Sequence, residues 1–276
     1  MRWTMSGNDQ QREFWSGAMA TAWIERLDTL ERGLAGINDA LMAFADLKPG
    51  MAVLDIGCGP GTTTEQIAAV TGGRTVGLDI SKPLIDAAKA RSRGATEFIE
   101  ADATDYPFRP EFDLVFSRLG LMFFADPVAS FANIRRAVKP GGRLAFLVWA
   151  SMEEIPYLIE PLNAVRDLLP PVELPPPDAP GGYALADNAR TRRILEQSGW
   201  HAIESRHVTP PSFLGATLPE AVEAACNLGP IAQRFREADE TTKTEVRRRV
   251  SAILARFETG DGVVPPAACW LIEARA

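Results

Sequence analysis

The stretch VLDIGCGPGTTTEQ, residues 53–66, decides the fold of this chain. It packs three glycines, Gly57, Gly59 and Gly61, into five positions between an apolar run and a row of threonines. Glycine lets the backbone turn sharply and approach a ligand closely, so this stretch is typical of a nucleotide-binding turn between a strand and a helix. Several classes of enzyme use such turns, and the surrounding residues must distinguish them.

Two common nucleotide-binding turns do not fit this spacing. A phosphate-binding loop of the Walker type needs a lysine after its last glycine, and no lysine follows here. The dinucleotide fingerprint GxGxxG needs glycine or alanine where this chain has Thr62. Asp55, at the end of the apolar run, would repel a pyrophosphate but suits a cationic ligand. Thr62 and Glu65 have the spacing of a capping box, which predicts that a helix begins there.

Length, composition and charge are those of an ordinary globular protein. The chain has 276 residues, of which 46% are hydrophobic and 24% charged, and its net charge is −7. This acidic balance argues against a broad nucleic-acid surface, and we interpret the basic cluster at 247–249 as a solvated helix face. The three cysteines, at 58, 226 and 269, have no paired or metal-binding spacing, so no metal site is predicted.

The chain is expected to work in the cytoplasm without stable membrane insertion. Its first residues, MRWTMSGNDQQREF, contain no apolar run of the signal-peptide type. The longest apolar run, LAFLVWA at residues 144–150, is far too short to span a bilayer. An odd number of cysteines without a secretory signal favours a reducing compartment.

From residue 51 onward, short apolar runs alternate with helical windows. The apolar runs are MAVLDI, RTVGLD, TEFIEA, FDLVFS and GRLAFLVWA, and windows such as KPLIDAAKARS and PVASFANIRRAV separate them. This alternation predicts an α/β fold in which helices cover both faces of a parallel sheet. KPGG, residues 139–142, is expected to end one helix and turn the chain into the next strand.

We predict one sheet domain with helical additions. Residues 1–48 carry apolar positions at helical spacing and are expected to form an N-terminal helical lid. Residues 49–150 form the core, and residues 151–187, which contain PPVELPPPDAPGGY, form a loop-rich insertion. Residues 188–276 complete the sheet, with DNARTRRILEQSGW as a helix and AACWLIEARA as the last strand. A helical cap inserted at 210–260 is expected to select the substrate.

Two more predicted strands end in acidic residues. Asp79 ends the run VGLD, where a carboxylate can accept hydrogen bonds from both hydroxyls of a ribose. Asp102 and Ala103 follow the third run, where an acceptor and a backbone amide can bind an adenine. A single Asp at a strand end is often only a helix cap. Together with the glycine-rich turn, however, these residues predict one ligand crevice at the carboxyl edge of the sheet.

The ordered motifs DIGCGPG, VGLDIS, ADATDYPF, FDLVFSRLGLMFFADP and VKPGGRLAF resemble those of class I S-adenosylmethionine-dependent methyltransferases. The nearest group includes the ubiquinone and menaquinone C-methyltransferases and many small-molecule methyltransferases. The resemblance is strong over residues 50–150. It implies a Rossmann-like, seven-stranded, mostly parallel sheet whose last strand is antiparallel. It also implies S-adenosyl-L-methionine as cofactor, S-adenosyl-L-homocysteine as product and a small organic molecule as methyl acceptor.

The resemblance implies how the first turn contacts the cofactor. Asp55, Gly57 and Gly59 would cradle the methionine part, with Gly61 nearby. Cys58 would be a small residue of the turn in contact with the cofactor and not a nucleophile.

The next two strand ends would hold the rest of the cofactor. By the same resemblance, Asp79, with its neighbour Ile80, would hold the ribose, while Asp102 and Ala103 would hold the adenine.

The acceptor side offers two candidate side chains. By resemblance, Ser117, Arg118 and Leu119 would lie beside the methionine part and the acceptor. Arg118 either binds an acidic group of the acceptor or pairs with Asp126 or a backbone carbonyl. His207, near the end of a predicted strand, is the candidate general base, with a structural or surface histidine as the alternative. Methyl transfer needs no catalytic triad, because the sulfonium already activates the methyl group.

Two tryptophans of the N-terminal region complete the predicted site. Trp15 and Trp23 are eight residues apart on one helical face and are expected to fold over the crevice as a lid. Trp15 then either contacts the sulfonium by cation–π attraction or packs on the sheet. A methyltransferase is the leading function, and a non-catalytic cofactor-binding partner or an NAD-dependent oxidoreductase is the alternative.

Overall fold

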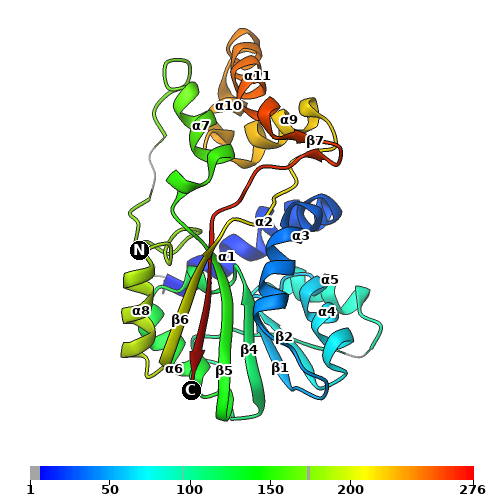
Figure 1. Ribbon diagram of the computed structural model, residues 1–276, viewed down its shortest axis with the longest axis vertical. Coiled ribbons are helices and arrows are strands. Elements are labelled where there is room, and N and C mark those ends of the chain that lie inside the picture. The colour runs from blue at the N-terminus through cyan, green and yellow to red at the C-terminus, as the bar shows by residue number, and fades with distance from the viewer. Residues whose placement is uncertain (1–6, 95, 173–174) are drawn as a thin grey trace, which may run out of the picture.

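The computed structural model describes residues 7–94, 96–172 and 175–276. It has two tiers, a sheet flanked by helices and a cluster of helices above the carboxyl ends of the strands (Figure 1). None of the described helices is both long and apolar enough to cross a membrane.

A seven-stranded sheet forms the centre of the fold, in the order β3-β2-β1-β4-β5-β9-β6. Adjacent strands are parallel from β3 to β5, while β9 runs antiparallel to both of its neighbours. The predicted Rossmann-like sheet is therefore confirmed, including its antiparallel last strand. The strands are β1 Val53–Ile56, β2 Thr75–Asp79, β3 Glu97–Glu100, β4 Phe112–Arg118, β5 Val138–Trp149, β6 His201–Val208 and β9 Cys269–Arg275.

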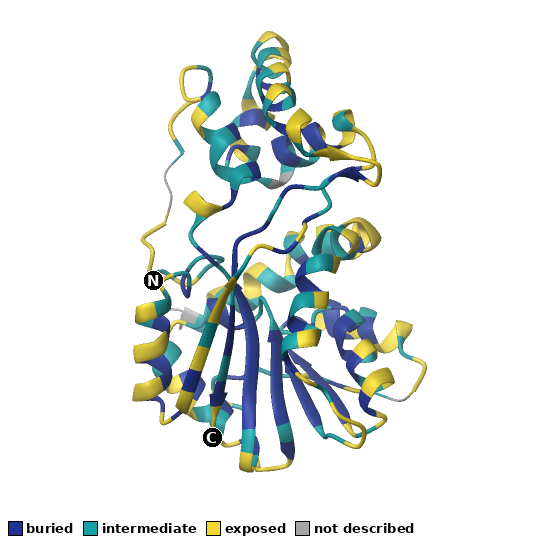
Figure 2. Cartoon of the chain, in the orientation of Figure 1, coloured by how far each residue is buried: buried dark blue, intermediate teal, exposed yellow. Residues whose placement is uncertain are grey.

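Helices cover both faces of the sheet because its strands are apolar on both sides. Val53 of β1 packs with α3 (Leu27–Phe44) and α4 (Thr62–Thr71), whereas Leu54 and Ile56 pack with α6 (Pro127–Arg135) and α8 (Asn188–Gln197). Helix α5 (Lys82–Arg91) packs on β2 and β3. The inner strands β1, β2, β4, β5 and β9 are buried along most of their length, whereas most residues of the edge strands β3 and β6 are not buried (Figure 2). This alternation also directs Asp55 toward α4.

Two local predictions are wrong. Helix α4 begins at Thr62 as expected, but its N-cap is Gly61, at a φ of 83° and without a side-chain cap, and Glu65 instead accepts a hydrogen bond from Ser92. The capping box is therefore absent. KPGG lies inside β5 and not between a helix and a strand, because β5 begins at Val138 and shifts its pairing register with β4 there.

The upper tier consists of four helices and a short ribbon. The helices are α7 Pro156–Ala164, α9 Leu218–Leu228, α10 Ala232–Glu237 and α11 Glu240–Leu254, and the ribbon is β7 Glu258–Thr259 with β8 Gly262–Val263. Helix α7 lies in the segment predicted to be loop-rich. The buried residues of these helices belong to the same hydrophobic cluster as β4 and β5, so one continuous core extends from the sheet into this tier.

The basic cluster at 247–249 lies on α11 and is ion-paired. Arg247 pairs with Glu223 at 2.5 Å. Arg248 and Arg249 pair with Glu245 at 2.7 and 2.9 Å, and Arg249 also contacts an aspartate of the segment after α7. These pairs are what a solvated helix face is expected to have, and they leave none of the three charges unpartnered.

Two short helices precede α3 and lie across the carboxyl ends of the strands (Figure 1). They are α1 Gly7–Ser16 and α2 Ala18–Glu25, in the region predicted to form a helical lid. Helix α1 is held by the loops after β2 and β3. The Ser81 hydroxyl donates to the Trp15 carbonyl at 2.8 Å, and the Arg12 guanidinium donates to the Ile80 carbonyl at 3.4 Å.

Candidate functional site

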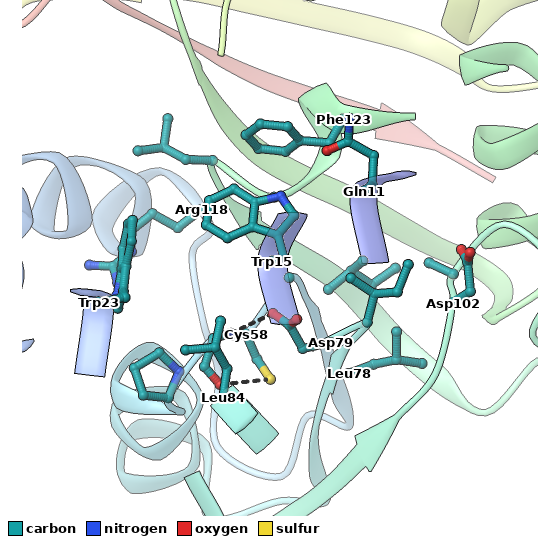
Figure 3. Close-up of a pocket in the computed structure, with 18 of the residues that line it drawn as sticks. Gln11, Trp15, Trp23, Cys58, Leu78, Asp79, Leu84, Asp102, Arg118 and Phe123 are labelled. Carbon is teal, nitrogen blue, oxygen red and sulfur yellow. Dashed lines mark hydrogen bonds between the residues drawn. The ribbon is translucent and has the colours of Figure 1, made fainter. Parts of the chain in front are cut away.

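A pocket lies between α1, α2, α3 and the carboxyl ends of β1 to β4, and it measures about 910 Å³ when the open solvent space at its mouth is included. Its described lining residues run from Asn8 to Phe124, so the upper tier contributes none of the side chains assigned to its wall. Figure 3 shows Trp15 near the centre, with Trp23 and Asp102 at opposite ends of the view.

The glycine-rich turn forms the floor of the pocket because β1 and β4 end very close together. Gly57 has a φ of 71°, and a Cβ on it would lie 2.7 Å from the Cα of Gly120, which follows β4. A Cβ on Gly120 would lie 2.7 Å from the Ile56 carbonyl oxygen. Gly59 also has a positive φ and lines the pocket. Gly61 does not line it, because it faces the ring of Phe98.

Asp79 lines the pocket, and its carboxylate accepts hydrogen bonds from backbone amides. One oxygen accepts the Gly59 amide at 2.8 Å and the other accepts the Ser81 amide at 2.9 Å. Burial raises the pKa of this carboxyl, against the effect of these amides. The Ile80 amide also acts on this carboxylate, whose two oxygens offer four lone pairs in all, so acceptor capacity remains for a ligand. That arrangement suits two neighbouring hydroxyl groups of a ligand.

Asp102 lines the same pocket beyond β3, together with Ile80 and Ala103. One oxygen of Asp102 accepts the Thr104 amide at 2.9 Å, and the other accepts the side-chain amide of Asn8 in α1. Asn8 was not predicted as a site residue. A polar residue near the start of an amphipathic helix carries no signal that it will contact a strand end 94 residues later.

Asp55 and Ser117 lie behind the pocket wall and are not among its lining residues. Asp55 is 1% exposed and accepts a hydrogen bond from the Thr64 hydroxyl at 2.7 Å. Burial raises its pKa to about 7, opposed by Thr64 and Arg118, while the charges of Asp79 and Glu31 add to the rise. The Ser117 hydroxyl donates to the Ile56 carbonyl at 2.7 Å, which ties β4 to the first turn.

Arg118 lines the pocket and is paired with Glu31 of α3, not with Asp126. Its two terminal nitrogens donate to the two Glu31 oxygens at 2.9 and 2.8 Å. The two side chains are only 11% and 17% exposed. Asp126 instead caps α6. The sequence held a signal for Glu31 that was missed, because this acid lies four residues after the buried Leu27 on the apolar face of a helix.

Aromatic side chains close the pocket on the side of α1 and α2. The Trp15 ring lies 5.1 Å from Phe123 and 6.0 Å from Trp23, both in edge-to-face geometry. All three line the pocket, with Phe124 and Leu119 beside them. Leu119 has a φ of 61°, a strained conformation for leucine, at the point where β4 ends.

Cys58 also lines the pocket, in the turn between Gly57 and Gly59. Burial raises the pKa of its thiol well above the usual value, and the nearby carboxylates of Asp79 and Asp55 add to this rise. The thiol is therefore protonated at neutral pH and is a poor nucleophile.

His207 lies away from this pocket. It ends β6, an edge strand separated from β4 by β5 and β9. Its Nε2 lies 2.9 Å from a Glu154 oxygen, and its ring packs 4.9 Å from Trp270. His207 is not among the pocket's lining residues, although β6 does direct it to the carboxyl edge as expected.

Comparison with known proteins identifies the part of the chain that supplies the strand ends of this pocket. Residues 54–146 match a family model described as a methyltransferase domain. Residues 54–146 form a class I S-adenosylmethionine-dependent methyltransferase domain. The resemblance inferred from the motifs is thereby confirmed, and S-adenosylmethionine is the cofactor of that family.

Curated relatives match part of the chain. An uncharacterised protein of Mycobacterium tuberculosis is 34% identical over 123 residues, 43% of this chain and 44% of its own. The demethylmenaquinone methyltransferase of Clavibacter sepedonicus is 36% identical over 115 residues, 39% of this chain and 46% of its own. Cycloartenol-C-24-methyltransferase 1 of Oryza sativa subsp. japonica is 33% identical over 183 residues, which are 63% of this chain and 50% of the relative. The chain thus spans half the length of these relatives or less.

Solved structures share the fold at low sequence identity. A putative methyltransferase from Bacillus halodurans has a TM-score of 0.54 at 19% identity, covering 86% of this chain and 97% of its own. The phosphoethanolamine N-methyltransferase 2 of Haemonchus contortus, solved with S-adenosyl-L-methionine, has a TM-score of 0.52 at 20% identity. The match covers 86% of this chain and 51% of that one.

Proposed function

We propose that this chain is an S-adenosylmethionine-dependent methyltransferase that methylates a small, partly apolar organic acceptor in the pocket beneath α1 and α2. The observation that carries this proposal is the meeting of the Gly57–Gly59 turn, Asp79 and Asp102 in one pocket. These residues come from three neighbouring strand ends, at the edge where open α/β sheets bind their ligands.

The lining residues fit the parts of the cofactor. The Asp79 carboxylate faces the pocket and accepts the ribose hydroxyls in addition to its backbone amides. Asp102 and Ala103 then hold the adenine, and Ile80 lies beside it. The tight contact between Gly57 and Gly120 leaves only backbone at the floor, where the methionine part lies. Asp55 and Ser117 support this floor from behind, and Gly61 shapes the turn that begins α4.

The protein's part in the reaction is to align the acceptor and to exclude water. S-adenosylmethionine supplies a methyl group already activated by the sulfonium. Trp15, Phe123 and Phe124 form an apolar wall beside the lining carboxylates. Alignment of reacting groups in such a site can lower the barrier by about 7–11 kcal/mol. This is why a site without a catalytic triad is sufficient for the transfer.

The relatives and the lining support an apolar acceptor. The names of two relatives, a demethylmenaquinone methyltransferase and a cycloartenol-C-24-methyltransferase, indicate acceptors with large apolar parts. The aromatic wall of this pocket agrees with that class. We also propose that the protein works in the cytoplasm on a small molecule and not on nucleic acid.

Calorimetry with S-adenosylhomocysteine and with NAD tests the cofactor. We expect micromolar or tighter binding of S-adenosylhomocysteine and no binding of NAD, and the opposite pattern would indicate an oxidoreductase. Transfer of a labelled methyl group to a panel of apolar acceptors and to a cell extract tests catalysis. Cofactor binding without transfer to any fraction would favour the non-catalytic partner.

A further inference from the structure

The charged groups at the acceptor end of the pocket are arranged around one cation. Among the lining residues that the structure describes, Arg118 is the single positively charged side chain. It faces Glu31 of α3, and the charge of the buried Asp55 on β1 also acts on it. Arginine has five N–H donors, and the hydrogen bonds to Glu31 use two of them. Three donors remain for a ligand.

The same pocket offers no side chain free to remove a proton, judged on the described lining. Asp79 and Asp102 lie where the proposed function puts the ribose and the adenine. The Cys58 thiol is protonated, because burial and two nearby carboxylates raise its pKa. Glu31 accepts hydrogen bonds from both terminal nitrogens of Arg118, so protonating it would break that bidentate pair and leave a mostly buried cation without its partner.

The remaining wall of this end is apolar. Leu34, Leu119, Phe123 and Phe124 line it, with Trp15 and Trp23 above. An acceptor that fits here therefore has an apolar body and presents its nucleophilic atom without help from a protein base.

We propose that the methyl acceptor is an acid with an apolar ring, of the acidic phenol or enol class, which binds as its anion beside Arg118. The proposal rests on the proposed function. Glu31 is then a positioning residue that fixes the guanidinium while three of its donors stay available. The anion donates a lone pair to the methyl carbon as the bond from that carbon to sulfur breaks. The electron pair of the broken bond goes to sulfur, which becomes a neutral thioether, and no proton is transferred to the protein.

This class also suits the electrostatics of the pocket. An anionic acceptor and a sulfonium have opposite charges, and both charges disappear on transfer. A pocket with aromatic walls solvates two separate ions poorly, so it favours the transition state, in which the charges are already smaller. A neutral acid would gain less from Arg118 than its anion does, and its methylation would leave a proton without a base to accept it.

Binding of 4-nitrophenol tests the proposal, because its anion and its neutral form absorb differently. The probe is added to the complex with S-adenosylhomocysteine at one fixed pH, equal to the pKa of the free probe. We expect its ionisation constant to rise about tenfold or more on binding, as for an acid placed beside an arginine. Glu31→Gln, which removes the competing carboxylate, should increase the bound anion further. Arg74→Gln serves as control, since Arg74 is half-exposed and pairs with Glu111 and Glu97.

The double variant Glu31→Gln/Arg118→Gln removes both charges and leaves an uncharged polar side chain at each position, so that neither charge is left without its partner. We expect it to lose the rise in ionisation. A probe that fails to bind, that binds in the neutral form, or that ionises equally in the double variant overturns the proposal. It is also overturned if the double variant binds S-adenosylhomocysteine more weakly but binds 5′-methylthioadenosine normally, because Arg118 would then hold the methionine carboxylate. Wild-type protein that binds no S-adenosylhomocysteine refutes the proposed function itself, before any probe is added.

Discussion

The two halves of the sheet's carboxyl edge use polar residues differently. Where β1, β2, β3 and β4 end, carboxylates and glycines face a pocket and keep unused acceptor sites, as Asp79 does. Where β5 and β6 end and β9 begins, polar side chains contact each other, as His207 contacts Glu154. The groups able to bind a ligand therefore lie where β1 to β4 end, whereas β5, β6 and β9 connect the sheet to the upper tier.

The largest effect on ligand binding is expected from Asp79→Ala. It removes both acceptors proposed for the ribose, and hydrogen bonds to a charged group contribute about 1.5–3 kcal/mol each. We expect the dissociation constant of S-adenosylhomocysteine to rise on the order of 1000-fold, about 4 kcal/mol, by calorimetry. Asp86→Ala, on the exposed side of α5, is the control. Equal affinity in the two variants would remove Asp79 from the site.

Asp55→Asn is expected to raise the stability of the fold while weakening the binding of S-adenosylmethionine. Burial raises the folded-state pKa of Asp55 from 3.8 to about 7, so the folded state binds a proton that the unfolded state releases. Ionisation of Asp55 therefore costs stability progressively as the pH rises from about 4 to 7, and the cost is fully present above pH 7. It amounts to at most about 4 kcal/mol.

Urea unfolding at pH 5 and pH 8 measures this effect. Asp55→Asn keeps an acceptor for Thr64, so we expect it to be more stable than wild type at pH 8, with a smaller advantage at pH 5. The same variant should bind S-adenosylmethionine more weakly, because the carboxylate that attracts its positive charges is gone. A variant that is less stable than wild type at pH 8 contradicts this account of Asp55.

A pair of glycine variants tests the contact between the turns after β1 and β4. Gly57 and Gly59 both have a positive φ, but only at Gly57 would a Cβ meet another backbone, 2.7 Å from the Gly120 Cα. At Gly59 no atom lies within 4 Å of that position. Both alanine variants carry the left-handed strain of about 1 kcal/mol, and overpacking adds about 1–3 kcal/mol to Gly57→Ala alone. Equal losses in thermal unfolding would show that the turns can separate without cost.

A smaller effect on cofactor binding is expected from Asn8, which joins α1 to the loop after β3. Asn8 donates to the Asp102 carboxylate and holds α1 over the pocket, together with the contact between Ser81 and Trp15. Asn8→Ala removes one hydrogen bond to a charged group, so we expect S-adenosylhomocysteine to dissociate about tenfold faster. Stopped-flow tryptophan fluorescence follows this rate through Trp15. Gln10→Ala, on the exposed side of α1, should not change it.

The sequence predicted the pocket residues at the strand ends better than those on the N-terminal helices, for physical reasons. Strand ends and the glycine-rich turn are local features, so Asp79, Gly57 and Asp102 were assigned to one edge before any contact was known, and the structure brings them into one pocket. Asn8 and Glu31 reach the pocket through packing of α1 and α3 on the sheet. The position of Glu31 on an apolar helix face indicates that it is buried, but no local pattern names Arg118 as its partner or predicts the contact of Asn8.

The same limit applies to two residues that motif position assigned to the ligand. Asp55 and Ser117 have the expected positions in the chain, but strand alternation turns Asp55 toward α4, and the Ser117 hydroxyl bonds to the Ile56 carbonyl. Motifs thus identify which strand end takes part, whereas the direction of each side chain depends on the layers on either side.

The smallest effect on activity is expected from His207→Ala, which tests whether the β5–β9–β6 half of the carboxyl edge takes part in catalysis. Two strands separate β6 from β4, and the His207 ring lies between Glu154 and Trp270, not in the pocket. A general base must come within hydrogen-bond reach of the proton it removes, directly or through one water. We therefore expect turnover and S-adenosylhomocysteine affinity to stay within about twofold of wild type, as for His201→Ala at the exposed start of the same strand. If His207→Ala slows turnover at least tenfold with unchanged cofactor affinity, while His201→Ala does not, the far half carries a catalytic base. The acceptor would then have to extend from the pocket past β5 to reach it.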